Sequence, residues 1–114
     1  MTLRAVTEIL ARHRESFLRA YVYGSVARGE EDQASDVDLV LVRETGAAFF
    51  DRIREVMGLV RELGPLDLLI YTPRELEEMV GDRSNGFLQD VVSEGVLVEG
   101  SQGRGAALAA PGRE

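Results

Sequence analysis

Acidic side chains stand in two otherwise apolar segments of this chain. Asp36 and Asp38 open the segment 36–42, and Asp67 is the only charged residue of the segment 66–71 (LDLLIY). Side chains at positions i and i+2 of a strand share a face, so Asp36 and Asp38 are expected side by side. Such acids are often only solvated. Close carboxylates repel each other, however, and a protein tolerates this where a cation neutralises them. On neighbouring strands the three carboxylates would form an all-oxygen site that suits Mg²⁺.

A glycine-serine turn precedes these acids. Gly24 allows a ligand close to the backbone, and Ser25 lies at the expected start of a short helix, with Arg28 one turn further on. Hydroxyl and guanidinium donors at such a turn are suited to phosphate, although an ordinary strand-to-helix turn with a serine cap has the same pattern. Beside a carboxylate site with two Mg²⁺ ions about 3.5–4 Å apart, a phosphate cradle would support displacement at phosphorus.

The remaining patterns predict the elements that position these side chains. Apolar stripes predict helices over 2–19, 46–63, 73–80 and 85–94, a single helical turn over 26–29, and strands over 20–23, 37–42, 66–71 and 96–98. A polar loop is expected over 30–35. The order predicts one α/β (α+β) layer fold with a small sheet flanked by helices.

Local signals mark several of the helix ends. Thr72 followed by Pro73 and Glu75 is a capping-box pattern, Gly64 stops the preceding helix, and Asn85 can cap the last one. In the helix over 46–63, Arg52 is expected on the outer, solvated face.

Composition limits the class of protein. The 114 residues favour one domain, with residues 1–99 as the folded domain and 100–114, rich in Gly and Ala, as a low-complexity tail that is expected to be disordered. There is no cysteine, so no disulfide and no thiolate metal site are expected. No apolar run is long enough to cross a membrane, and the N-terminus has no signal-peptide pattern, so a cytoplasmic location is expected.

Charge is distributed unevenly along the chain. The net charge of −7 combines +3 over residues 1–29, −11 over 30–99 and +1 over the remainder. This balance argues against binding of long nucleic acid. It is compatible with bound cations or with a basic protein partner, which the acidic helix face of Glu75, Glu77, Glu78 and Asp82 could also meet.

Other candidate residues have simpler explanations. His13, the only histidine, is expected to be solvated on the first helix. Tyr23 borders the glycine-serine turn and could stack on a base, although a core position is favoured. Glu30, Glu31 and Asp32 could extend the metal site, but a solvated loop is the preferred interpretation.

Two motifs together resemble a known family. Gly24-Ser25-Val26-Ala27-Arg28-Gly29, followed by Ser35-Asp36-Val37-Asp38-Leu39, resembles the signature of the minimal nucleotidyltransferases of the DNA polymerase β superfamily. That signature is G-S-x-A-R-G, a short spacer, then S-D-h-D-h, where h is apolar. The resemblance extends over most of residues 1–99, and the segment 87–98 resembles the family's closing helix and strand.

The resemblance implies a polymerase-β-like palm with a mixed sheet, and transfer of a nucleoside monophosphate from a nucleoside triphosphate, typically ATP, to an acceptor hydroxyl. By the family pattern, Asp36 and Asp38 hold two Mg²⁺ ions, and Asp67 holds the catalytic one and helps to deprotonate the acceptor. Gly24 and Ser25 bind the triphosphate. Arg28 contacts the triphosphate or braces the loop.

The acceptor is the open question at this stage. Larger members carry a second domain that binds it, for which this chain has no room. Minimal members often accompany a small helical partner of the HEPN type, and the resemblance implies an antitoxin that transfers AMP to a tyrosine hydroxyl of an RNase toxin. Two alternatives stay open: a small-molecule nucleotidyltransferase, for example of an antibiotic, acting as a homo-oligomer, and a non-catalytic antitoxin that neutralises its partner by contact.

Overall fold

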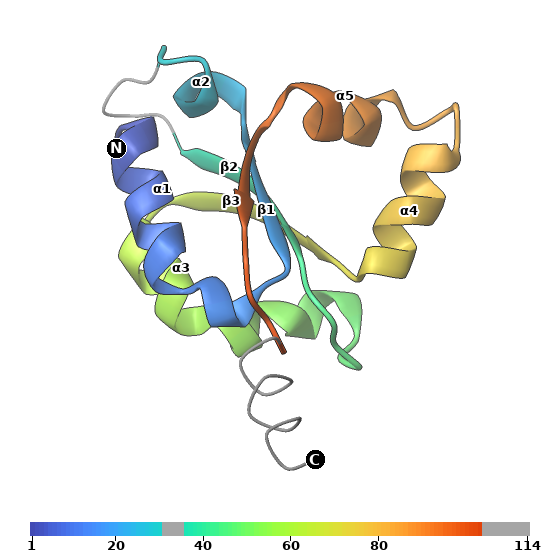
Figure 1. Ribbon diagram of the computed structural model, residues 1–114, viewed down its shortest axis with the longest axis horizontal. Coiled ribbons are helices and arrows are strands. Elements are labelled where there is room, and N and C mark those ends of the chain that lie inside the picture. The colour runs from blue at the N-terminus through green and yellow to red at the C-terminus, as the bar shows by residue number, and fades with distance from the viewer. Residues whose placement is uncertain (31–35, 104–114) are drawn as a thin grey trace, which may run out of the picture.

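The computed structural model describes residues 1–30 and 36–103, which form one mixed sheet covered on both faces (Figure 1). The strand order is β3-β2-β1-β4. The parallel pair is β2 with β3, and the other two pairs are antiparallel. The strands span β1 Arg19–Tyr23, β2 Val37–Val42, β3 Leu66–Tyr71 and β4 Val96–Glu99. The predicted strands and the α+β class are therefore confirmed, whereas Glu31, Asp32 and Ser35 lie outside the described residues.

Helices pack on each face of the sheet. Figure 1 shows α1 (Leu3–Arg12) and α3 (Met57–Leu63) on one side and α4 (Pro73–Gly81) and α5 (Gly86–Glu94) on the other. A four-residue helix, α2 (Gly24–Ala27), follows β1 directly. The 3-10 helices η1 (Arg14–Ser16) and η2 (Phe49–Val56) complete the described elements.

The central strand β2 is apolar on both faces because both faces are buried. Leu39 and Leu41 belong to the core under α1 and α3, whereas Val40 and Val42 belong to the core under α4 and α5. Since alternate residues of a strand share a face, Asp38 points to the α4/α5 side. The charged end of β2 is thus directed to that side of the sheet.

The predicted caps form as the sequence indicates. Thr72 and Glu75 make a reciprocal capping box at the start of α4. The Asn85 side chain accepts a hydrogen bond from the Leu88 N–H at 3.3 Å and caps α5. Gly64 ends α3 with φ +75°, a conformation that favours glycine.

The first helix is shorter than predicted. It ends at Arg12 instead of continuing to Arg19, and η1 follows it. The reason is pairing in the sheet, because the Leu18 N–H donates to the Val42 carbonyl at 2.7 Å and the Leu18 carbonyl accepts from the Gly100 N–H at 2.8 Å. Phe17 leaves the helix pattern but is still completely buried. Tertiary pairing here overrides a helical pattern.

The helix predicted over 46–63 is also wrong in its first half. Residues 46–48 are not helical, the 3-10 helix η2 spans Phe49–Val56, and only the rest, α3, is α-helical. Arg52, expected on the outer face, is only 6% exposed. Its guanidinium donates to the Ala47 and Ile70 carbonyls, each at 3.0 Å, and to both carboxylate oxygens of Glu75, at 2.6 and 3.0 Å. These contacts hold the segment in its tighter form.

Two side chains predicted to be solvated are part-buried and make contacts with other elements of the fold. The His13 side chain is only 21% exposed, and its Nε2 lies 2.5 Å from Glu62 of α3. Glu75, predicted on the acidic face of α4, is instead the partner of Arg52. The prediction of a solvated His13 is therefore wrong, and the acidic face of α4 loses one of its members.

The start of the predicted tail pairs with the domain. Ser101 and Gln102 donate backbone hydrogen bonds to the carbonyls of Arg14 and Phe17, at 2.8 and 3.0 Å. Residues 104–114 lie outside the described residues, so the division into a domain over 1–99 and a tail over 100–114 stays a prediction. In the described part of the chain, no helix has the length and apolar character needed to cross a bilayer.

Candidate active site

The glycine-serine turn at the end of β1 lies against the start of β2. Gly24 has φ +74°, and a Cβ at this position would overlap the Asp38 carboxylate. Both the backbone angle and the close approach of Asp38 therefore require glycine. The site begins with this contact, since it sets the Asp38 carboxylate directly beside the turn.

Asp38 and Asp67 meet across the parallel pair of strands. They are register partners in β2 and β3. The pKa of Asp38 is raised, first by burial, then by the charge of Asp67 and a hydrogen bond between the two carboxyl groups, and further by the charge of Asp36; Arg28 acts in the opposite direction. The predicted convergence of these two carboxylates is observed. Asp67 is exposed on an edge strand, which explains how an apolar strand accommodates it.

Asp36 lies just outside this pair. It precedes β2 and is exposed, and it acts on Asp38 through its charge. Within residues 1–30 and 36–103, no three acidic, histidine or cysteine side chains lie close enough together to hold a metal ion. The Asp38–Asp67 pair nevertheless fits a hard cation, because it offers only carboxylate oxygens and because a bound cation would offset the repulsion that raises the pKa of Asp38.

The remaining motif residues surround the turn. Ser25 is half-buried in α2, and its carbonyl accepts the Glu30 N–H at 2.9 Å. Arg28 follows α2 and is exposed, and its Nε donates to Glu30 at 3.0 Å. Gly24, Ser25 and Arg28 thus lie on one short turn beside the carboxylate pair, as the sequence predicts.

Tyr23 connects the carboxylates with a pocket. It is the register partner of Asp38 in β1, and burial, together with the charges of Asp38 and Asp67, raises the pKa of Tyr23 to about 12. Its ring meets that of Phe87 edge to face, with centroids 5.4 Å apart. Tyr23 is only half-buried, so it is a wall of the site as well as a core residue.

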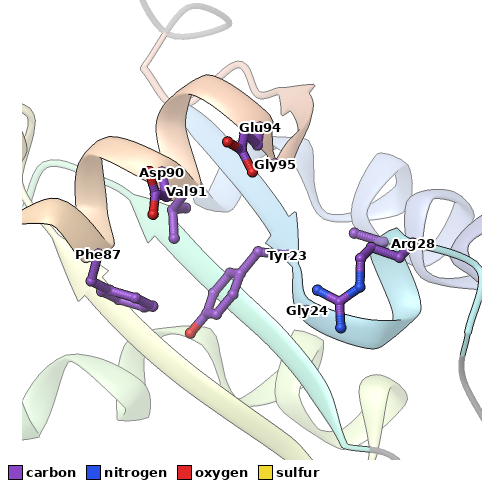
Figure 2. Close-up of a pocket in the computed structure, with 9 residues that line it drawn as sticks. Tyr23, Gly24, Arg28, Phe87, Asp90, Val91, Glu94 and Gly95 are labelled. Carbon is purple, nitrogen blue, oxygen red and sulfur yellow. The ribbon is translucent and has the colours of Figure 1, made fainter.

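A pocket of about 230 Å³ opens between α2 and α5 (Figure 2). Gly24 and Arg28 line it from the turn, and Phe87, Asp90 and Glu94 line it from α5. Sequence reasoning assigned Phe87 to the apolar face of a helix and did not consider the two acids. Their spacing of three and four residues places all three on one side of α5, which is the signal that could have found them.

The arrangement is suited to chemistry on a phosphate ester. The glycine-serine turn offers hydroxyl and guanidinium donors, and the carboxylates of Asp38 and Asp67 lie beside it. The pocket lined by Tyr23 and Phe87 adjoins the turn. Positioned donors and cations that neutralise developing charge are the main requirement for phosphoryl-type transfer.

Three comparisons relate the chain to known proteins. Residues 5–102 match the family model described as polymerase beta, nucleotidyltransferase. A Sulfolobus solfataricus crystal structure, described as a proposed nucleotidyltransferase, is 27% identical with TM-score 0.50 and covers 67% of this chain and 74% of that one. A structure described as a proposed minimal nucleotidyltransferase is 31% identical with TM-score 0.45, covering 82% and 85%. A comparison with curated proteins found no match. The family model spans most of the sequence, and the chain belongs to the polymerase beta nucleotidyltransferase family.

Proposed function

We propose that this nucleotidyltransferase moves AMP from ATP to a hydroxyl group of a partner protein, with Mg²⁺ as cofactor. The observation that carries the proposal is the meeting of Asp38 and Asp67 against the Gly24 turn. Two carboxylates held together despite their repulsion can bind cations, and the cations would offset this repulsion and neutralise charge on a triphosphate. Membership of the family supports transfer of a nucleotide in general.

The proposed step is a displacement at the α-phosphorus of ATP. The acceptor oxygen forms a bond to this phosphorus, the bond to the bridging oxygen breaks, and pyrophosphate leaves. The hydroxyl proton passes to Asp67, whose exposed position leaves it open to an acceptor. Gly24, Ser25 and Arg28 orient the triphosphate for attack, so the chain contributes mainly positioning.

Asp36, Asp38 and Asp67 would hold the Mg²⁺ ions. When bound, these ions would neutralise charge on the phosphate oxygens and on the acceptor oxygen. The carboxylate-only donor set fits this role, as does the raised pKa of Asp38, which reflects its burial first and then the neighbouring charges of Asp67 and Asp36.

The proposed acceptor lies on a separate chain. All described elements build the sheet and its two helical layers. By its resemblance to minimal nucleotidyltransferases, the chain is proposed to be the antitoxin of a HEPN-type RNase toxin and to modify a tyrosine hydroxyl of that partner. The net charge of −11 over residues 30–99 favours a partner with a basic surface.

The test uses ATP labelled at the α-phosphate, Mg²⁺ and a candidate HEPN-type partner. Label is expected on the partner with the wild-type chain, and it should be absent with Asp38→Asn. The matched control is Asp51→Asn, the same substitution at an exposed carboxylate on η2. Chelation of divalent cations should stop transfer, and restoring Mg²⁺ should recover it.

Other outcomes would select the alternatives. Label on an aminoglycoside or another small alcohol, with none on a protein, would indicate a small-molecule transferase. Tight binding that silences the partner without label transfer, and that persists in Asp38→Asn, would indicate a contact-only antitoxin and would overturn the proposed chemistry.

A further inference from the structure

The pocket beside the glycine-serine turn is too small for a whole nucleotide. Its volume is about 230 Å³, below the roughly 300–1,000 Å³ of sites that enclose drug-sized ligands. It suits one ring system. Gly24 both lines this pocket and touches the Asp38 carboxylate. A single nucleotide could therefore place its ring in the pocket and its phosphates at the carboxylate pair.

Phe87 offers an aromatic surface in this pocket. It is 49% exposed, although its neighbour Leu88 is almost completely buried. Tyr23 meets it edge to face with centroids 5.4 Å apart, which holds the ring in place but leaves no room for a third ring between them. A flat ligand would therefore stack on the outer face of Phe87. Nucleobases stack on aromatic side chains in this way.

The charges of the pocket differ from one side to the other. In Figure 2, Arg28 and Gly24 lie on one side of Tyr23, and Phe87 and Asp90 lie on the other. Glu94 lines the pocket from the last turn of α5. The carboxylates on α5 would repel a triphosphate but would accept hydrogen bonds from an amino group. A nucleotide therefore fits in one orientation, with its phosphates toward Arg28 and its base toward α5.

We propose that this pocket is the base subsite of the enzyme, in which Phe87 stacks on a nucleobase and the carboxylates of Asp90 and Glu94 accept hydrogen bonds from its exocyclic amino group. This inference rests on the proposed function, because it assumes a nucleoside triphosphate at the carboxylate pair. It extends that function by assigning a selectivity for bases that carry an amino group, and by giving the exposed side of α5 a role in binding as well as in packing.

The test compares ligands with and without a base. Dissociation constants of the full chain are measured by calorimetry with Mg²⁺ for ATP, inosine triphosphate and inorganic tripolyphosphate. Inosine triphosphate keeps the purine ring but replaces the amino group with a carbonyl oxygen. Phe87→Ala should weaken ATP binding about tenfold and leave tripolyphosphate unchanged, as expected for loss of one stacked base. Phe87→Tyr, which keeps the ring, should retain most of the affinity.

The matched control is Phe50→Ala. Phe50 is 87% exposed on η2 and lies outside the pocket, so its removal tests the effect of losing any surface aromatic ring. The variant Asp90→Asn/Glu94→Gln changes only exposed side chains. It should reduce the preference for ATP over inosine triphosphate from about tenfold toward equality.

The outcomes separate this inference from the proposed function. Wild-type binding of ATP that is no tighter than that of tripolyphosphate, or equal ATP binding by wild type and Phe87→Ala, would overturn the base subsite while leaving the transferase intact. Unchanged ATP binding with loss of transfer in Phe87→Ala would also overturn it, since the pocket would then hold the acceptor. Failure of the wild-type chain to bind any triphosphate would overturn the proposed function itself.

Discussion

Two charged pairs at opposite ends of β3 are built in contrasting ways. Arg52 and Glu75 have opposite charges, share two hydrogen bonds and bind further backbone groups near Ile70. Asp38 and Asp67 have the same charge and still meet at the start of the strand. The opposite charges of Arg52 and Glu75 offset each other within the chain. The second pair is left with an excess of negative charge that a ligand from outside would have to offset.

The pKa values show the same contrast. The pKa of Glu75 is lowered to about 2, first by its hydrogen bond to Arg52 and then by the Thr72 N–H. The pKa of Asp38 is raised, first by burial and then by Asp67. A lowered carboxyl pKa means that folding favours the charge, and a raised one means that folding resists it. We therefore assign the Arg52 pair to stability and the Asp38 pair to function.

The largest effect is expected from Asp38→Asn. Nucleotide transfer should fall about 1,000-fold, equivalent to about 4 kcal/mol of transition-state stabilisation. The melting temperature should stay the same or rise, because the substitution removes a repelling charge. Initial rates with labelled ATP and thermal unfolding by circular dichroism measure the two quantities. A large loss of stability in Asp38→Asn would contradict the assignment, since it would make Asp38 a structural residue.

Arg52→Met tests the other pair. We expect the free energy of unfolding to fall by about 3 kcal/mol, at the lower end of the range for breaking a buried pair, because Glu75 keeps 40% of its side chain exposed to water. Urea unfolding measures the change. Arg54→Met is the matched control, since Arg54 is exposed on the same 3-10 helix, and it should change stability by less than about 0.5 kcal/mol. Equal losses in the two variants would refute a special role for Arg52.

Acid should change the stability contributions of the two pairs in opposite directions. The contribution of Glu75 is fully present above its unfolded pKa of 4.5 and is lost as the pH falls toward about 2. Solvent screening of the part-exposed side chain limits the loss to about 2 kcal/mol. Asp38 has a raised pKa, so its protonation in the folded chain adds stability as the pH falls below that value. At pH 7, Glu75→Gln should be less stable than wild type and Asp38→Asn should be as stable or more stable, and both stability curves should approach the wild-type curve, from opposite sides, as the pH falls to 2.

Much of the fold could be predicted because its signals are local. The cap at Thr72, the stop at Gly64 and the cap at Asn85 each depend on a few neighbouring residues. The strands follow from short apolar runs between such signals. The early end of the first helix could not be predicted, because it depends on Leu18 pairing with Val42 and Gly100, which are distant in the chain.

The burial of Arg52 could not be predicted from the sequence for a related reason. An amphipathic pattern assigns a charged residue to the solvated face. The Arg52 guanidinium instead has four hydrogen-bond acceptors: the Ala47 carbonyl, the Ile70 carbonyl of β3 and both carboxylate oxygens of Glu75 in α4. These partners come together only once the sheet forms. The segment that carries Arg52, η2, is a 3-10 helix although its apolar spacing also fits an α-helix.

The candidate site was predictable in its residues but only partly in its geometry. Strand periodicity and the motif identified Gly24, Asp38 and Asp67. The register that makes Asp38 and Asp67 direct partners depends on how β3 returns beside β2 after α3, which no local pattern specifies. The position of Phe87 in the pocket could not be predicted, because a half-exposed aromatic residue follows the same helical periodicity as a buried one.

The smallest effect is expected at the capping box that joins Glu75 to α4. Thr72→Ala removes the oxygen that accepts the Glu75 N–H at 3.1 Å, so the unfolding free energy should fall by about 1 kcal/mol. The reciprocal bond from the Thr72 N–H to Glu75, at 3.0 Å, remains, and with it the Arg52 pair. Thr72→Ser, which keeps the hydroxyl, should retain most of the stability. A loss in Thr72→Ala as large as that in Arg52→Met would show that the cap, and not the buried arginine, holds this end of the sheet.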